Sequence, residues 1–188
     1  MLRALRRLFR LLIVPLLVAL TASAGLAGEA EDKAALDKLF ADLRVAPDAS
    51  TAHEIDQRIW FYWTTPSDPI LAGRMREALT ARAMGDSMAA IRLLDELVAD
   101  FPQYAEGWNQ RATLYYMIGD YEASIADCAR VLELEPRHFG ALSGRALMYL
   151  QLGKRALALK DMATAIAIHP FLTERQLFPE LDNPATQI

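Results

Sequence analysis

The sequence repeats itself every 34 residues through more than half of its length, and this period constrains the fold more than any other feature. A shift of 34 residues superimposes alanines, glycines and prolines in three successive units without a gap. The coinciding positions are Ala78, Ala112 and Ala146; Gly85, Gly119 and Gly153; and Pro102, Pro136 and Pro170. The units run over 71–104, 105–138 and 139–172. Because a period of this length is typical of stacked helix-turn-helix units, we predict an all-α solenoid.

Glycine, proline and alanine each mark one point in the repeat unit. Glycine accepts the left-handed conformation that closes a helix, so Gly85, Gly119 and Gly153 are expected where the first helix of each unit ends. Proline cannot continue a helix, so the three prolines are expected where the second helix ends. The small alanines are expected where the two helices cross. Asp86 and Asp120 directly follow two of the glycines and can cap the second helix.

The second unit resembles the tetratricopeptide repeat. Its matching residues are Trp108, Ala112, Tyr115, Gly119, Asp120, Tyr121, Ala123, Val131, Leu134 and Pro136. The first and third units keep the alanine, glycine and proline positions but have Arg74 and Leu142 where the family has tryptophan. The resemblance covers 71–172. It implies a right-handed solenoid of helical hairpins whose first helices line a concave binding face.

Two charged positions vary together between the units. The second and third units have Arg111 and Arg145 at position 7, and the same two units have Asp127 and Asp161 at position 23. The first unit has neither charge pair. Because the two positions lie on facing parts of paired helices, we predict the ion pairs Arg111–Asp127 and Arg145–Asp161. A partly buried pair of this kind fixes helix register more than it adds stability.

The first 27 residues have the pattern of an export signal. Four arginines precede the uncharged run 11–20, and small residues follow it; the arginines are Arg3, Arg6, Arg7 and Arg10. This order is typical of a secretory signal peptide, with cleavage expected after Ala24 or Ala27. The expected location is therefore the bacterial periplasm, by the general or the twin-arginine export route. An uncleaved anchor in the inner membrane is the alternative, because residues 11–28 carry no charge.

The repeats are flanked by two segments that do not follow the period. Residues 28–70 predict a divergent capping pair of helices, the second starting with a capping box at Thr51 and Glu54. The aromatic run 60–63 is expected to cover the first repeat, with Phe61 or Tyr62 partly exposed, since four consecutive rings cannot share one helix face. Residues 173–188 predict a tail with a short capping helix.

Catalytic and nucleic-acid-binding patterns are missing from the sequence. The formal net charge of −4 disfavours nucleic acid as a partner. The three histidines are scattered, and no metal-binding, phosphate-binding or nucleophile motif is present. The single cysteine, Cys128, is expected to be a buried structural thiol. We therefore predict a protein that is not an enzyme and that has no cofactor or bound metal.

The resemblance assigns the binding face to six positions of each first helix. The expected partner-binding residues are Arg76, Arg82, Asn109, Gln110, Thr113, Tyr116, Met117, Leu147 and Leu150. The amides of Asn109 and Gln110 are expected to hydrogen-bond an extended backbone, and the two arginines are expected to hold an acidic group. The predicted function is a non-catalytic scaffold of the cell envelope that binds a protein or peptide segment, without membrane contact beyond the signal sequence.

Two alternatives for this scaffold stay open at this point. The chain's own N-terminal or C-terminal segment could fill the concave face. The protein could also be an assembly factor or subunit of a larger envelope complex, docking through the aromatic N-terminal cap or the open C-terminal end of the solenoid.

Overall fold

The computed structural model describes residue 28 and residues 30–182. Their elements are a helix over residues 30–44, α2 (Ala49–Thr64), α3 (Pro69–Ala83), α4 (Ser87–Asp100), α5 (Ala105–Met117), α6 (Tyr121–Leu134), α7 (Phe139–Gln151), α8 (Arg155–Ile168) and the 3₁₀ helices η1 (Thr173–Leu177) and η2 (Pro179–Asp182). No strand occurs in these residues, which confirms the all-α prediction. The predicted export signal lies outside the described residues. Within them, no helix is long and apolar enough to cross a membrane.

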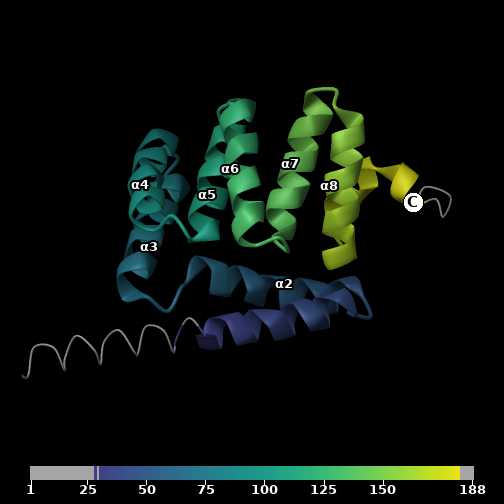
Figure 1. The fold of residues 1–188 in the computed structure, drawn as a ribbon, viewed down its shortest axis with the longest axis horizontal. Coiled ribbons are helices and arrows are strands. Elements are labelled where there is room, and N and C mark those ends of the chain that lie inside the picture. The colour runs from purple at the N-terminus through teal and green to yellow at the C-terminus, as the bar shows by residue number, and fades with distance from the viewer. Residues whose placement is uncertain (1–27, 29, 183–188) are drawn as a thin grey trace, which may run out of the picture.

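The three repeat units are three antiparallel helix pairs that stand side by side (Figure 1). They are α3 with α4, α5 with α6, and α7 with α8. Each pair turns at the predicted glycine, with φ of 80° at Gly85, 82° at Gly119 and 70° at Gly153. In the first turn, the Asp86 amide donates to the Ala81 carbonyl at 3.0 Å, closing the helix end as a left-handed glycine allows. The repeat landmarks therefore have the backbone roles that their residue types predicted.

Aspartate side chains start most of the helices that the sequence led us to expect. Asp86 and Asp120 each accept a hydrogen bond from a backbone amide in the first turn of α4 and α6. Asp68 does the same for α3, with Pro69 as the first helical residue. The predicted capping box at Thr51 is wrong. Asp48 caps α2, accepting from the Thr51 amide at 2.8 Å, because a short carboxylate just after a helix-breaking proline is itself a good cap.

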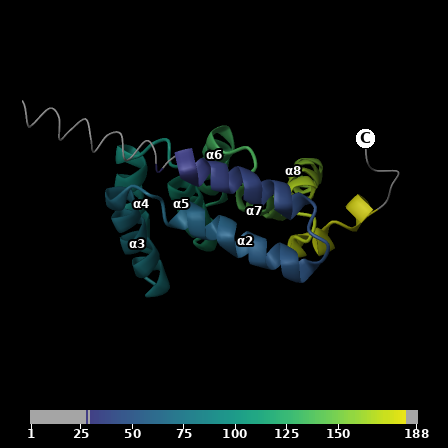
Figure 2. The ribbon, with the colours of Figure 1, turned by 90° about the horizontal axis from the view of Figure 1, so that it is seen from below.

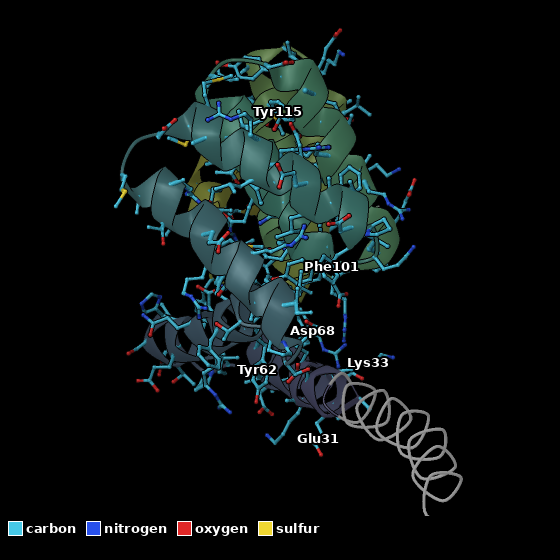
Figure 3. All side chains as sticks on the ribbon, turned by 90° about the vertical axis from the view of Figure 1, so that its left-hand side faces the viewer. Glu31, Lys33, Tyr62, Asp68, Phe101 and Tyr115 are labelled. Carbon is cyan, nitrogen blue, oxygen red and sulfur yellow. The ribbon has the colours of Figure 1, made fainter. Side chains whose placement is uncertain are left out.

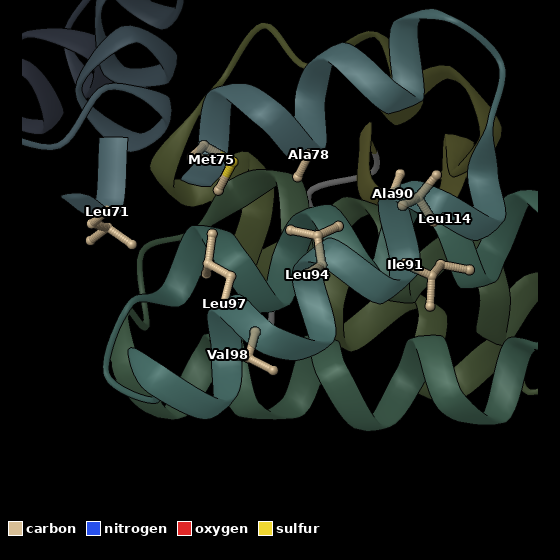
Figure 4. Close-up of a cluster of buried hydrophobic side chains, with 9 residues drawn as sticks. All are labelled: Leu71, Met75, Ala78, Ala90, Ile91, Leu94, Leu97, Val98 and Leu114. Atoms are coloured by element: carbon tan, nitrogen blue, oxygen red, sulfur yellow. The ribbon is translucent and has the colours of Figure 1, made fainter. Parts of the chain in front are cut away.

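Each helix pair shares its core with the next pair along the chain. Figure 4 shows the first cluster, in which Leu71, Met75 and Ala78 of α3 face five apolar residues of α4. Leu114 of α5 completes this cluster, so the second unit covers the first. A solenoid unit cannot bury its apolar face alone, and this shared packing is what stabilises the stack.

The N-terminal helix pair runs crosswise beneath the repeats instead of stacking on the first one (Figures 1 and 2). The expectation that its aromatic rings cover the first repeat is wrong. The Trp63 ring stacks on His138, at the junction of the second and third units, with centroids 3.9 Å apart. The Tyr104 hydroxyl donates to the Trp63 carbonyl, and Leu172 packs into the same cluster. Tyr104, His138 and Leu172 share the last position of the repeat unit, so the period itself builds a row onto which the pair docks.

The exposed aromatic predicted for this segment is Phe61, whose exposed fraction is 61%. Its neighbours on the helix, Trp60 and Trp63, point into the junction with the repeats. At the other end of the chain, Phe178 is fully buried against α7 and α8, and Leu177 is 52% exposed. The segment after Pro170 therefore caps the last repeat with one aromatic ring and two short 3₁₀ helices.

Candidate partner-binding face

The predicted partner-binding residues lie on α3, α5 and α7, the first helices of the three units; we refer to this side as the first-helix face. Their exposure differs sharply along each helix. Met117 is 60% and Tyr116 is 38% exposed near the C-terminal end of α5, and Arg76 is exposed on α3. Thr113, Leu147 and Leu150 are half-buried, whereas Asn109 and Gln110 are buried. The face thus has an open half toward the glycine turns and a closed half toward the inter-repeat loops.

The closed half is built around a fully buried carboxylate, that of Glu106. It accepts hydrogen bonds from the amide of Asn109 at 3.1 Å and from the amide of Gln110 at 2.5 Å. His138 Nδ1 accepts from the Ala141 amide, so its Nε2 carries the proton that it donates to Glu106 at 2.9 Å. Three donors therefore satisfy one buried charge, as burial requires.

This network corrects two expectations about ligand binding. The amides of Asn109 and Gln110 donate to Glu106, so they are not available to an extended backbone. Arg82 donates from Nη1 to the Gln110 side-chain oxygen at 2.5 Å, so it is held inside the protein as well. Of the two arginines expected to hold an acidic group, only Arg76 is fully exposed, and the described residues form no ion pair with it.

The N-terminal helix pair closes this half of the face from outside. Trp63 covers His138, and Trp60 approaches α7 so closely that a Cβ added at Gly140 would lie 2.8 Å from Trp60 Cη2. Arg137 in the adjoining loop pairs with Asp37 at 2.6 Å and lies over the Phe40 ring. The alternative in which the chain's own N-terminal segment fills the face is therefore realised over the closed half.

A cavity of about 120 Å³ opens between α5 and α7, beyond the closed half. Its walls combine predicted binding residues with small residues from the hairpin interior. They are Asn109, Ala112, Thr113, Tyr116, Ser124, Cys128, Gly140, Gly144, Leu147 and Met148. The structure thus brings Thr113, Tyr116 and Leu147 together around one opening, while Arg76 and Met117 lie outside it.

The two predicted ion pairs are confirmed, and they set the spacing of the helices that carry this face. Arg111 Nε and Nη2 each donate to the Asp127 carboxylate at 2.8 Å, and Arg145 binds Asp161 in the same way at 2.6 and 2.9 Å. The hydrogen bond to its aspartate raises the pKa of each arginine, so both remain charged. Each pair ties a first helix to the second helix of its own unit.

The buried thiol behaves as its position predicted. Cys128 is buried at the floor of the 120 Å³ cavity, and burial raises its pKa to about 12. A thiol with so high a pKa is a poor nucleophile at neutral pH. Among the described residues, no cluster of histidine, cysteine and acidic side chains could hold a metal ion.

Two further cavities border the N-terminal helix pair. The larger, about 590 Å³, lies where the pair meets the first inter-repeat loop, near Tyr62, Asp68 and Phe101 (Figure 3). The other, about 340 Å³, contains Asp56 and His169. Burial raises the pKa of Asp56 and lowers that of His169, so burial disfavours the charged form of both groups.

Sequence reasoning missed the contribution of His138 and of Trp63 to the closed half. The available signal was the last position of the repeat, which holds Tyr104 and His138 in the first two units. These residues can hydrogen-bond and stack, unlike a plain apolar residue. A row of such residues along one edge of a solenoid indicates that a further element docks there.

Comparison with known proteins gives consistent results. The family model of the tetratricopeptide repeat matches residues 75–136 and 119–172. A TPR repeat-containing protein of Rhizobium etli is 38% identical over 138 residues, which cover 73% of this chain and 68% of the relative. Among solved structures, the second TPR of Spaghetti (RPAP3), bound to an HSP90 peptide, is similar with a TM-score of 0.51 and 22% identity, over 53% of this chain and 92% of that one. The crystal structure of MamA is similar with a TM-score of 0.49 and 18% identity, over 70% of this chain and 71% of that one.

Proposed function

Because this chain belongs to the tetratricopeptide-repeat family, whose members are protein-binding scaffolds, we propose that it is a non-catalytic scaffold of the bacterial cell envelope. In this proposal, it holds a segment of another protein on the first-helix face of its repeats. The observation that carries the proposal is the cavity between α5 and α7, around which Thr113, Tyr116 and Leu147 converge.

The open half of the first-helix face has the composition of a protein-binding surface. Tyr116 and Met117 present apolar area beside the cavity, and aromatic residues and methionine are enriched at interfaces. Arg76 supplies an exposed positive charge at the other end of the face. A partner segment that crosses the three units would therefore place apolar side chains near α5 and α7 and an acidic group near α3.

The envelope location rests on the sequence pattern of residues 1–27. N-terminal sequencing of the protein recovered from cell-envelope fractions tests it, and the expected mature chain starts after Ala24 or Ala27. A chain that starts at Met1 and stays in washed membranes would instead establish the anchor alternative.

Site-specific photocrosslinking in living cells tests the binding face. A photoreactive amino acid at Tyr116, on the open half, should form an adduct with a defined partner protein. The same amino acid at Arg92, exposed on the outer helix α4, is the control and should form none. Adducts of equal yield from the two positions would refute binding at this face.

A second candidate is docking of a larger complex at the N-terminal helix pair, which the 590 Å³ cavity favours. Aromatic rings of Tyr62, Trp63 and Phe101 line it together with Leu71. The same photoreactive amino acid placed at Tyr62 tests this candidate. An adduct at Tyr62 without one at Tyr116 would make the helix pair, and not the first-helix face, the docking surface.

A further inference from the structure

One glycine of the first-helix face has no structural reason to be glycine within this chain. Gly144 lies in the interior of α7, where glycine destabilises a helix relative to alanine. Its φ is not positive, and a Cβ added to it would meet no atom within 4 Å. Neither the backbone nor the packing of this chain therefore requires it. Close approach of a ligand is a further reason for a glycine.

The two junctions between neighbouring units differ at this repeat position. At the first junction the position is held by Gln110, whose side chain accepts a hydrogen bond from Arg82 of the preceding unit. At the second junction the same two positions are held by Gly144 and Tyr116. The space that a glutamine side chain occupies at the first junction is the 120 Å³ cavity at the second.

The cavity walls are apolar in effect, although some carry polar atoms. The Ser124 hydroxyl donates to the Ala112 carbonyl at 2.6 Å, and the Thr113 hydroxyl donates to the Asn109 carbonyl at 3.0 Å. The Asn109 amide is engaged by Glu106. No charged side chain lines the cavity. Because these donors are already used inside the protein, the cavity favours an occupant that needs no hydrogen bond.

The volume narrows the choice of occupant further. A cavity of roughly 150 Å³ lined by apolar side chains holds benzene. This cavity, at about 120 Å³, is smaller and suits a branched or linear aliphatic side chain better than an aromatic ring. A water molecule would need two to four polar partners, which these walls do not offer.

We propose that the cavity between α5 and α7 is a specificity socket for one aliphatic side chain, that of leucine, isoleucine, methionine or valine, carried by the partner segment. This inference rests on the proposed function, since it assumes that a segment of another protein crosses the first-helix face. Gly144 lets the backbone of that segment come close to α7, and the aliphatic side chain enters beside Tyr116.

A random peptide library displayed on phage and selected against the full chain tests the socket. The selected peptides should share one aliphatic position, and its replacement by alanine should weaken binding roughly 10- to 100-fold. Gly144→Gln places in the socket the residue type found at the first junction and should abolish binding of these peptides. Gly73→Gln, at an uncrowded glycine inside α3 and away from the socket, is the matched control and should leave binding unchanged.

The outcomes separate the socket from the binding face itself. If Gly144→Gln binds the peptides as the unmodified chain does, while Tyr116→Ala loses them, the socket inference is wrong and the binding face stands. If neither variant changes binding, the proposed face is wrong as well. Circular dichroism spectra should match among the variants, because Gly144 has open space around it.

A direct measurement covers the case in which the library yields no binder. The methyl group of Met148, a wall of the cavity, is observed by NMR while N-acetyl-leucine methylamide is added. The methyl signal should shift in the unmodified chain and not in Gly144→Gln, and N-acetyl-aspartate methylamide should shift neither. An unshifted Met148 signal at saturating leucine derivative would overturn the proposal.

Discussion

Asp161→Ala should destabilise the protein more than Asp127→Ala, although the two aspartates occupy the same position of the repeat. Each substitution removes the carboxylate of a partly buried, two-bond ion pair and leaves an arginine behind. Arg145 then has only the Tyr149 ring, 5.9 Å away, among the described residues. Arg111 still has a second carboxylate, that of Asp95 at 2.8 Å.

The magnitudes follow from burial. Removing one partner of a buried pair costs about 3 to 5 kcal/mol, and the lower end applies here because the Arg145 side chain is 19% exposed. We therefore expect a loss of about 3 kcal/mol for Asp161→Ala. The pair that remains in Asp127→Ala is half-exposed at Asp95 and contributes up to about 1 kcal/mol, so that loss should be about 2 kcal/mol.

Urea unfolding followed by far-UV circular dichroism measures both losses, provided that the slopes of the two variants agree. Adding Asp95→Ala to Asp127→Ala should remove the difference from Asp161→Ala. The reasoning is refuted if Asp127→Ala costs as much as Asp161→Ala, or if the added Asp95→Ala has no effect. As a control, Arg145→Met combined with Asp161→Leu should recover much of the loss, because no charge is then left buried alone.

Three other changes test the remaining parts of the structure. Gly144→Ala should raise the free energy of unfolding by roughly 0.5 to 1 kcal/mol, whereas Gly119→Ala, at φ of 82°, should lower it by roughly 1 to 2 kcal/mol; thermal denaturation with equal or reversed effects would contradict the assigned backbone conformations. Cys128 should react with a thiol reagent at neutral pH only after denaturation, since burial raises its pKa to about 12; rapid labelling of the folded protein would show that the cavity floor is open. Trp63→Ala should cost roughly 3 to 5 kcal/mol and release the N-terminal helix pair from the repeats; an unchanged melting temperature together with unchanged proteolysis of residues 30–64 would mean that the stack on His138 does not hold the pair.

Several features could be predicted from the sequence because their physical causes are local. A glycine that needs positive φ, a carboxylate that caps the next helix and a proline that ends one act within a few residues. The Arg111–Asp127 and Arg145–Asp161 pairs join helices 16 positions apart within one hairpin, and their joint absence from the first unit revealed them. The buried thiol of Cys128 followed from its apolar helical neighbours.

Other features depended on contacts that no local pattern records. Glu106 and His138 lie 32 positions apart in different units, and each looked like an ordinary surface residue in the sequence. Their contact turned Asn109 and Gln110 from expected ligand donors into partners of a buried carboxylate. The start of α2 was misplaced for a smaller reason, since Asp48 and Thr51 are both good caps and only the three-dimensional course of the chain selects between them.

The sequence by itself determined the repeat units, their turns and the ion pairs that fix each hairpin, because these depend on backbone conformations and contacts that recur with the 34-residue period. Only the tertiary structure decided how the binding face is divided. The N-terminal helix pair docks across the inter-repeat loops through Trp60 and Trp63 and closes one half of the face, while Gly144 leaves the socket open in the other. Docking of this kind is set by the fit between distant, non-repeating segments, and the period of a sequence carries no information about that fit.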